Sequence, residues 1–522
     1  MRLAGFLSFL CGALAAAGEI LGLSLPTVRW FFDVSRDVPL LHKNFGAFQF
    51  PWFGWFCAVL FMLGGIAMII RSFTSGPPNP ITVRRLQRFR AIKRGYYSLM
   101  ILVTLGGLAA LDQVVVGKRA LAVHYNGKWI FPAFMQRDLK NKDFGDTGPS
   151  AEAPAEYRKF KRSWAGSKNN RVIMPLVPYD PTGDTLPPGS RQLSKRDNYL
   201  TENGRSPYWG LVAKYHDIPE AKMHLRFAMR NGALNGPADG WTPDGNHVYT
   251  AEYVDGKLTT DHFNGIGTKE AFLVLPSSEL RAVKYHPAPP LPKEGQWLGT
   301  TSQGYDMVAY LYGGLQVNFK AALLYLPIVY FIGITFGMMM GYFGGWFDLV
   351  SQRLMEIFSN IPFLFVVIIL SSNVPERFKG LPVILTILIA FGWMGITYLM
   401  RTAAYRDKER DYISAAKVLG ARTPRILFRH LLPNTIAIIV TIIPFTMSGL
   451  VSALTSLDYL GFGLPPEYAT WGRLLNDGLA NLSAPWLVTS SFGVLVGLLV
   501  LITFVGEAVR EAFDPKKFTY YR

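Results

Sequence analysis

The sequence predicts an all-α polytopic membrane protein with a β-rich or α+β domain inserted between its spans. Half of the 522 residues are hydrophobic and only 17% are charged, whereas soluble globular chains carry about a quarter charged residues. The apolar residues gather in segments of about 20, the length that crosses the hydrocarbon core as a helix. A long hydrophilic stretch, residues 118–320, separates two groups of these segments.

Several segments are long and apolar enough to span a membrane: 3–25, 52–71, 97–117, 321–343, 353–372, 380–402, 434–456 and 486–506. The segment 353–372 is the least apolar, because it contains Arg353, Glu356 and Pro362. A helix inside a bundle tolerates such residues, while one facing lipid does not. The segment 3–25 also fits a signal peptide cut near Ala17, and both interpretations stay open.

Basic residues in short loops predict the orientation, because such loops stay in the cytoplasm. Residues 72–96 contain six basic residues and no acid, and residues 401–433 contain eight basic residues against three acids. Alternating the spans from these two loops places both termini, including the tail 516–522, in the cytoplasm. The stretch 118–320 then lies outside, since long loops translocate largely regardless of charge.

Short alternating runs in this external stretch predict strands, for example Arg119–Val123 and Phe272–Leu275. Asn126-Gly127 and Asp244-Gly245 are typical of the turns between strands. We therefore expect residues 118–320 to form an extracytoplasmic domain.

Several classes of function lack their signatures. The net charge of +17 follows membrane topology and is accompanied by no nucleic-acid-binding motif. The two cysteines, Cys11 and Cys57, have no partner at metal-ligand spacing. No G-x-x-x-x-G-K-[ST] phosphate loop occurs, so ATP would be hydrolysed by another chain. We expect no enzyme activity, metal or cofactor in this chain.

The loop 405–433 carries the most informative motif. Small side chains at Ala415 and Ala416, after Ser414, would let another surface approach the helix closely. Gly420 can adopt the backbone angles that end one helix and turn into the next. Leu432 and Pro433 follow, and a proline is harmless at the start of a membrane helix.

These residues resemble the coupling loop of bacterial ABC importer permeases, whose pattern is Glu-Ala-Ala, three residues, Gly, nine residues, Ile, one residue and Leu-Pro. Ser414 stands in place of the Glu, and His430 stands in place of the Ile. Gly341-Tyr342-Phe343-Gly344-Gly345 with Asp348, the run Leu457–Pro466, and Gly506–Pro515 resemble further segments of the peptide-transporting branch. Leu121–Pro132 is most similar to the second permease of Yej-type importers of oligopeptides and the peptide antibiotic microcin C.

The resemblance implies a type I ABC importer transmembrane fold in the bacterial inner membrane. Its domains would be an extra pair of spans at 1–71, a basic cytoplasmic linker at 72–96, core helix one at 97–117, the external domain at 118–320 and a five-helix permease core at 321–515. The chain would be a permease subunit of an ATP-driven peptide importer. Its partners would be a second permease, two ATPases that bind ATP and Mg²⁺, an extracytoplasmic peptide-binding protein and membrane lipid, with no nucleic acid.

Five residues are candidates for the translocation path or its gate: Glu356, Pro362, Gly461, Phe462 and Gly463. Two roles fit Glu356, lining the path or packing against a partner helix. The alternative function is an ion-coupled secondary transporter with an extracytoplasmic domain. That class is typically built from inverted sequence halves with ion sites inside the membrane, and neither feature is visible in the sequence.

Overall fold

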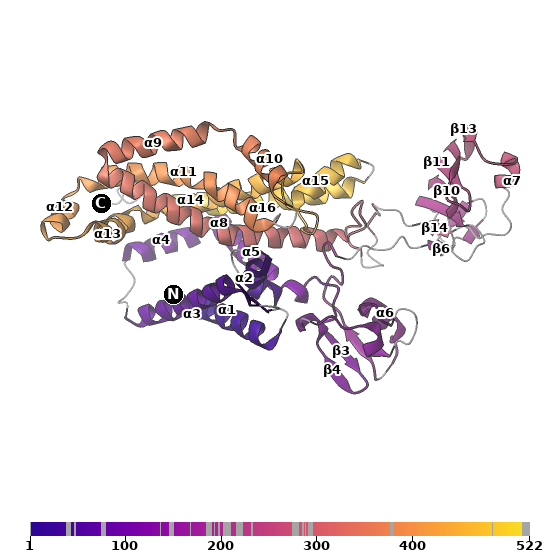
Figure 1. Cartoon of the computed structure of the whole chain (residues 1–522), viewed down its shortest axis with the longest axis horizontal. Helices are drawn as coiled ribbons and strands as arrows, with labels where there is room; N and C mark the ends of the chain where they lie inside the picture. The colour runs from indigo at the N-terminus through magenta and orange to yellow at the C-terminus, as the bar shows by residue number, and fades with distance from the viewer. Residues whose placement is uncertain are drawn as a thin grey trace. The chain divides into compact units, whose positions relative to one another are not determined.

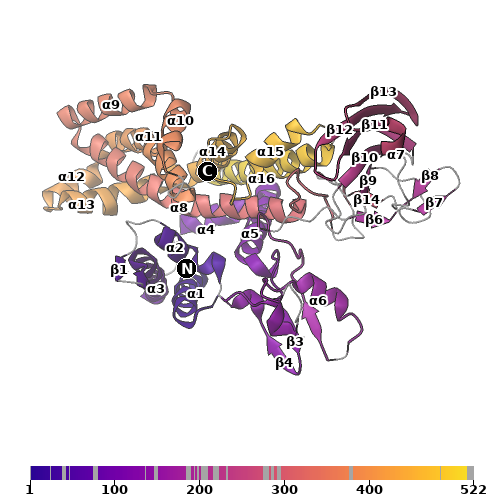
Figure 2. The same cartoon turned by 45° about the vertical axis from the view of Figure 1, so that its right-hand side comes forward.

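The computed structural model comprises two compact units, Met1–Asp184 with Val308–Arg522, and Thr185–Met307. Helices dominate the first unit, and a large sheet dominates the second (Figures 1 and 2). The structure describes residues 2–23, 25–37, 43–45, 48–74, 80–135, 137–145, 151–167, 169–183, 190–192, 194–196, 199–201, 210–215, 223–230, 233–273, 281–283, 287, 289–290, 296–375, 380–482 and 484–513.

The N-terminal part of the first unit is a helical hairpin with a third, amphipathic helix against it. Its elements are α1 (Arg2–Leu21), α2 (Pro26–Asp37), β1 (Lys43–Phe45), β2 (Phe48–Phe50) and α3 (Trp52–Thr74). Glycines allow α1 and α3 to approach closely: a Cβ at Gly12 would lie 2.7 Å from the Ala58 carbonyl oxygen. Phe32 of α2 is fully buried. Glu19 of α1, an acid within an apolar helix, forms an ion pair with Arg36 of α2, which offsets the cost of burying its charge.

Most of the remaining helices of this unit form a second bundle. They are α4 (Pro80–Ala91), α5 (Lys93–Ala110), α8 (Met307–Phe343), α9 (Gly345–Asn360), α10 (Phe363–Asn373), α11 (Leu381–Lys408), α14 (Leu432–Tyr459), α15 (Trp471–Ala480) and α16 (Pro485–Phe513). Among the described residues, five helical stretches are long and apolar enough to span a membrane, and the bent pair α9–α10 makes a sixth. The prediction of several apolar spans is therefore confirmed.

The structure differs from the sequence-based boundaries at three spans. The predicted span 353–372 is broken into α9 and α10, which are bent by 72°, because Pro362 precedes α10 and disfavours helical geometry in Ile361. The predicted span 97–117 ends its α-helix at Ala110. The helix predicted to start at 321 begins at Met307, so the part of 118–320 that follows residue 306 is helical.

Three glycines on α8 bring this helix against α11, and both views show the two helices side by side (Figures 1 and 2). A Cβ at Gly333 would lie 2.7 Å from Ile396 Cβ. One at Gly341 would lie 2.6 Å from Ala404 Cβ, and Gly337 between them faces Met400 at 2.8 Å. The glycines are four residues apart, as are their partners, so two parallel ridges meet along several turns. Such small-residue contacts are how helices associate in lipid.

Helix α5 is fastened to the bundle at both ends. Near its start, a Cβ at Gly95 would lie 3.0 Å from the Phe504 carbonyl oxygen of α16. In its last turn, the Leu108 carbonyl accepts a hydrogen bond from the Tyr312 hydroxyl of α8 at 2.6 Å. Just beyond its end, the Asp112 carboxylate accepts a hydrogen bond from Gln316 of α8 at 2.9 Å. Asp112 therefore lies in a polar contact between α5 and α8.

A small α+β part completes the first unit. Its three-stranded sheet has the order β4-β3-β5. Its elements are β3 (Ala122–Tyr125), β4 (Lys128–Ile130), β5 (Arg171–Ile173) and α6 (Tyr157–Ser163). Asn126 and Gly127 have φ of 47° and 78°, so they form the predicted tight turn between β3 and β4. Lys142 donates to Glu152 at 2.6 Å, and together with Lys140 it holds the pKa of Glu152 down at about 2.

The second unit contains a seven-stranded sheet in the order β13-β12-β11-β10-β9-β14-β6, with every pairing antiparallel. The strands of this sheet are β6 (Ser190–Gln192), β9 (Gly210–Tyr215), β10 (Met223–Arg230), β11 (Ala233–Trp241), β12 (His247–Val254), β13 (Lys257–Phe263) and β14 (Arg281–Val283). The same unit also contains the pair β7 (Ser194–Arg196) and β8 (Tyr199–Thr201) and the short helix α7 (Lys269–Leu273). The predicted β-rich or α+β content is confirmed.

Two details of the stretch 118–320 differ from expectation. The predicted domain 118–320 is divided between the two units at residue 184. Phe272, expected in a strand, lies in the short helix α7. Its ring packs 5.2 Å from the Phe263 ring, so contacts with the sheet override the local β-preference.

The α8–α11 contact gives a stability prediction. We expect Gly337→Leu to lower the stability of the purified chain in detergent by about 1–3 kcal/mol, because the added side chain overfills a packed interface. The matched control is Gly395→Leu on α11, where a Cβ would meet nothing within 4 Å. Thermal unfolding of both variants measures the difference, and equal midpoints would contradict the packing argument.

Candidate functional site: the loop between α11 and α14

The loop that carries the sequence motif is itself helical. After α11 ends at Lys408, the chain forms α12 (Asp411–Val418) and α13 (Thr423–Arg425). A π-helical segment, Ile426–Leu431, then continues directly into α14. Figure 1 shows α12 and α13 together at one end of the helical bundle.

Leu432 and Pro433 lie in the first turn of α14, but they do not mark the start of the helical rod. That rod runs from Thr423 to Tyr459, so Pro433 follows the π-helical segment within a longer rod. A π-helical turn leaves backbone groups with altered partners, which suits a position just before a residue that has no N–H. Leu432 is half-buried and Pro433 is exposed.

Gly420 ends α12 in the way the sequence predicts. Its φ is +75°. The Ala421 N–H donates to the Ala416 carbonyl at 3.0 Å, and the Gly420 N–H donates to the Lys417 carbonyl at 2.9 Å. These two bonds form a Schellman motif, which requires a left-handed residue at this position. A Cβ there would meet nothing within 4 Å, so the requirement for glycine is conformational.

Helix α12 has an inner and an outer face. Ile413 is fully buried and Ala416 is 7% exposed, whereas Ser414 and Ala415 are exposed. The structure therefore differs from the expectation for Ala416, which faces its own chain; only Ala415 leaves room for an approaching surface.

The tip of α12 carries two bare apolar side chains that the sequence analysis did not single out. Val418 is 87% exposed and Leu419 is 86% exposed. Their signal in the sequence is an apolar pair directly before the helix-ending glycine of a basic loop.

Polar contacts hold the base of this loop. Asp407, near the end of α11, is 1% exposed and accepts hydrogen bonds or ion pairs from Arg406 Nε at 3.0 Å and Arg410 Nε at 3.2 Å. Lys417 Nζ lies 5.3 Å from the centre of the Tyr342 ring at the end of α8. Arg410, directly before α12, and Lys417 on α12 thus connect this part of the loop to α11 and α8.

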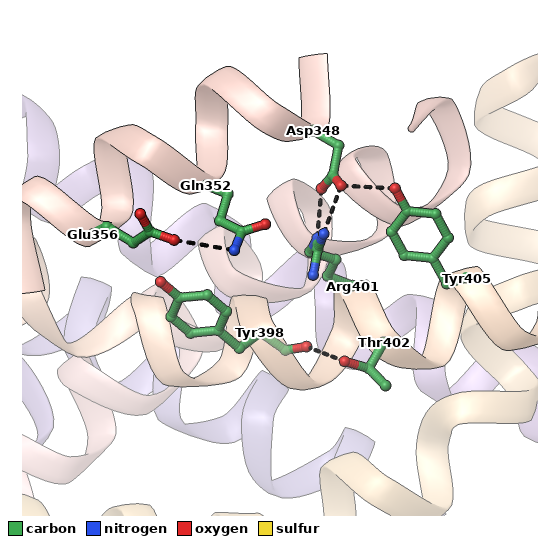
Figure 3. Close-up of polar contacts among 7 residues, drawn as sticks. All are labelled: Asp348, Gln352, Glu356, Tyr398, Arg401, Thr402 and Tyr405. Atoms are coloured by element: carbon green, nitrogen blue, oxygen red, sulfur yellow. Dashed lines mark hydrogen bonds and ion pairs between the residues drawn. The ribbon is translucent and has the colours of Figure 1, made fainter. Parts of the chain in front are cut away.

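A buried carboxylate joins the start of α9 to α11 (Figure 3). Asp348 is 3% exposed. Arg401 donates to it from Nε at 2.5 Å and from Nη2 at 2.6 Å, and the Tyr405 hydroxyl donates at 2.7 Å. A bidentate pair of this kind is strong and directional. We call Asp348, Arg401 and Tyr405 the α9–α11 clamp.

Sequence analysis connected Asp348 with a motif but did not predict its partners. The available signal was Arg401 at the edge of an apolar span, since a charge there calls for a partner. Arg401 is 53 residues from Asp348, so only the fold reveals the pair.

The candidate path residues lie in two elements. Glu356 accepts hydrogen bonds from Gln352 at 3.0 Å and Arg353 at 2.6 Å on its own helix, and Figure 3 shows the first of these. Pro362 lies at the break between α9 and α10. Their role in transport stays a prediction.

Gly461, Phe462 and Gly463 lie in the turn after α14. Gly461 has φ of +82°, and a Cβ at Gly463 would lie 2.7 Å from the Asp458 backbone nitrogen. The Asp458 carboxylate accepts the Leu464 N–H at 2.7 Å. This turn is therefore tightly held, and its part in the path also stays a prediction.

Among the residues that the structure describes, no group of three or more His, Cys, Asp or Glu side chains lies close enough together to hold a metal ion.

Comparisons with known proteins identify the family. Residues 333–519 match the family described as "Binding-protein-dependent transport system inner membrane component". The chain is 30% identical to "Inner membrane ABC transporter permease protein YejE" of Escherichia coli, over 84% of this chain and 98% of that protein. It is 29% identical to "Peptidoglycan transport system permease protein YejE" of Agrobacterium fabrum, over 84% and 94%.

A shorter similarity extends to "Oligopeptide transport system permease protein OppC" of Bacillus subtilis, which is 30% identical over 43% of this chain and 73% of that protein. The apolar helices, the loop geometry and these similarities agree. The chain belongs to the ABC transporter permeases that form the inner membrane component of binding-protein-dependent transport systems.

Proposed function

We propose that the chain forms half of the translocation path of an ATP-driven peptide importer. A second permease would form the other half, two ATPases would bind and hydrolyse ATP with Mg²⁺, and an extracytoplasmic binding protein would deliver the peptide. The chain itself would bind no cofactor. Both termini, the linker 72–96 and α12 would lie in the cytoplasm, because the short loops are strongly basic.

The observation that carries this proposal is the exposed apolar tip of α12. Two nearly fully exposed apolar side chains, Val418 and Leu419, lie at the end of a helix whose other face is buried. Covering them with a partner protein would remove their apolar surface from water, which is favourable. Ser414 and Ala415 would lie beside it in the same contact with an ATPase.

Two contacts of the loop, Lys417 over the Tyr342 ring and Arg410 with Asp407, support a path for force. A displacement of α12 would act on α8 through Tyr342 and on α11 through Asp407. The α9–α11 clamp would carry the motion of α11 to α9 and to the break at Pro362. The helices would then alternate between inward- and outward-facing arrangements as rigid bodies.

The substrate class rests on the relatives. Their names refer to oligopeptide and peptidoglycan transport, and peptides are the chemistry these share, since peptidoglycan carries peptide stems. We therefore propose peptides as substrates, including peptides released from peptidoglycan.

The first test is purification of the tagged chain from its native membrane after gentle cross-linking. We expect ATPases and a second permease to co-purify with the wild type. The amount of ATPase that co-purifies with the double variant Val418→Asp, Leu419→Asp should be lower by about tenfold or more. Unpaired charges in the centre of an interface remove the apolar contacts that contribute most to binding. The control is Leu176→Asp, another apolar residue that is 82% exposed, which should retain the full set.

Full ATPase retention by the double variant would reject α12 as the docking helix. If the wild type carried no ATPase at all, the proposed assembly with two ATPases would be rejected.

Gly420 provides a conformational test. Gly420→Val places a β-branched residue in left-handed geometry, which costs about 1–2 kcal/mol or more, whereas Gly420→Asn is tolerated better because Asn visits that region. We expect peptide uptake by cells that depend on the variant to be largely kept with Asn and largely lost with Val. Similar uptake in the two variants would show that the Schellman turn does not matter for transport.

The α9–α11 clamp predicts uncoupling. In vesicles containing the whole transporter, Asp348→Asn should lower the amount of peptide imported per ATP hydrolysed, because the Arg401 guanidinium loses its bidentate partner. The reversed pair Asp348→Arg with Arg401→Asp should restore part of the ratio. The control Glu152→Gln weakens an exposed ion pair with Lys142 (side chains 67% and 48% exposed) and should leave the ratio unchanged.

Because removing one partner of a buried pair also destabilises a protein, thermal unfolding of each variant accompanies the assay. A stable Asp348→Asn variant with an unchanged import ratio would overturn the proposed role.

A further inference from the structure

The helix that precedes α5 carries four arginines and no acidic residue. No acidic residue occurs between Arg71 and Asp112. Within this interval, α4 and the start of α5 carry Arg84, Arg85, Arg88, Arg90, Lys93 and Arg94. A cluster of four to eight basic residues directly beside a membrane helix is the pattern that attracts anionic lipid headgroups.

One side of α4 is fixed to the end of α16. Phe89 is 8% exposed and packs with Ala508 and Ala512. The Arg85 guanidinium lies 4.9 Å from the centre of the Phe513 ring. These contacts hold α4 beside the start of α5 and the end of α16, two apolar helices.

The other side of α4 is open. Arg84, Arg90 and Lys93 are exposed, and Leu86, one turn before Arg90, is 53% exposed. On the packed helix α16, the Glu507 carboxylate lies 3.6 Å from the Arg94 guanidinium, and that contact does not neutralise Arg84, Arg90 or Lys93. An apolar side chain beside arginines matches the boundary between headgroups and acyl chains. Tyr97, 61% exposed in the first turns of α5, is typical of the same boundary.

We propose that Arg84, Arg90 and Lys93 form a binding surface for the phosphate of an anionic phospholipid. The ligand class is a phospholipid with a net negative headgroup, such as phosphatidylglycerol or cardiolipin. The two arginines and the lysine bind the phosphate oxygens, and Leu86 contacts the acyl region. An acidic protein would satisfy the charges but would not need the adjoining membrane helices, so lipid is the occupant that fits all of these observations.

The test measures lipid retained by the full-length chain after extraction into mild detergent, by mass spectrometry. The triple variant Arg84→Gln, Arg90→Gln, Lys93→Gln is compared with the wild type. Since each basic residue near a membrane surface contributes about fivefold in affinity, we expect retained anionic lipid to fall at least about tenfold, with retained phosphatidylethanolamine unchanged. The variant Arg84→Lys, Arg90→Lys keeps the positive charges and should keep the lipid. It therefore separates the effect of lost charge from the effect of replacing the arginine side chains.

The matched control removes the same number of charges elsewhere. Lys159, Lys161 and Arg162 of α6 are exposed, and changing all three to Gln should leave retained lipid unchanged. Equal loss in both triple variants, or no loss in the α4 variant, would overturn the proposal. So would loss of a co-purifying protein from the α4 variant with unchanged lipid, because the surface would then bind a protein. The assay needs neither ATPase nor peptide, so its failure leaves the transport proposal untouched.

Discussion

The close contact between α8 and α11 is the constraint on which the end of the helical bundle that carries α12 depends. Lipid provides little hydrophobic drive for helix association, so α8 and α11 must gain their stability from close packing. Gly333, Gly337 and Gly341 make that approach possible. The same register brings Asp348, just beyond α8, to Arg401 on α11. Without it, α9 would lose its anchor, and α12 would lose the frame against which Ile413 packs.

Features set by local chemistry were predictable from the sequence. The apolar spans follow from composition, and the Asn126-Gly127 turn follows from residues that tolerate positive φ. Gly420 was predicted as a helix end on the same grounds, and the two backbone bonds around it confirm the motif. In each case a single residue type is almost sufficient, because the alternative residues cannot adopt the required backbone geometry.

Features set by tertiary contact were not predictable in the same way. Ala415 and Ala416 are identical in sequence, yet only the rotation of α12 decides that Ala416 is buried. Pro362 was visible inside an apolar run, but a tolerated proline and a 72° break look the same without the surrounding helices. The partner of Asp348 lies 53 residues away. The division at residue 184 also left no clear compositional mark, because both parts of the stretch are polar.

The asymmetry of α12 fits the coupling role proposed for it. A helix of eight residues is too short to be stable alone, so its inner face must be held by the bundle, as Ile413 and Ala416 are. If the same chain also covered the outer face of α12, a partner would have no apolar surface to bind and could not move the helix. Two bare apolar side chains in water are unfavourable by about 1.5–3 kcal/mol each relative to burial, and that free energy becomes available only when another surface covers them. The inner contacts therefore hold α12 rigidly against the bundle, and burial of the exposed tip would favour binding of a partner.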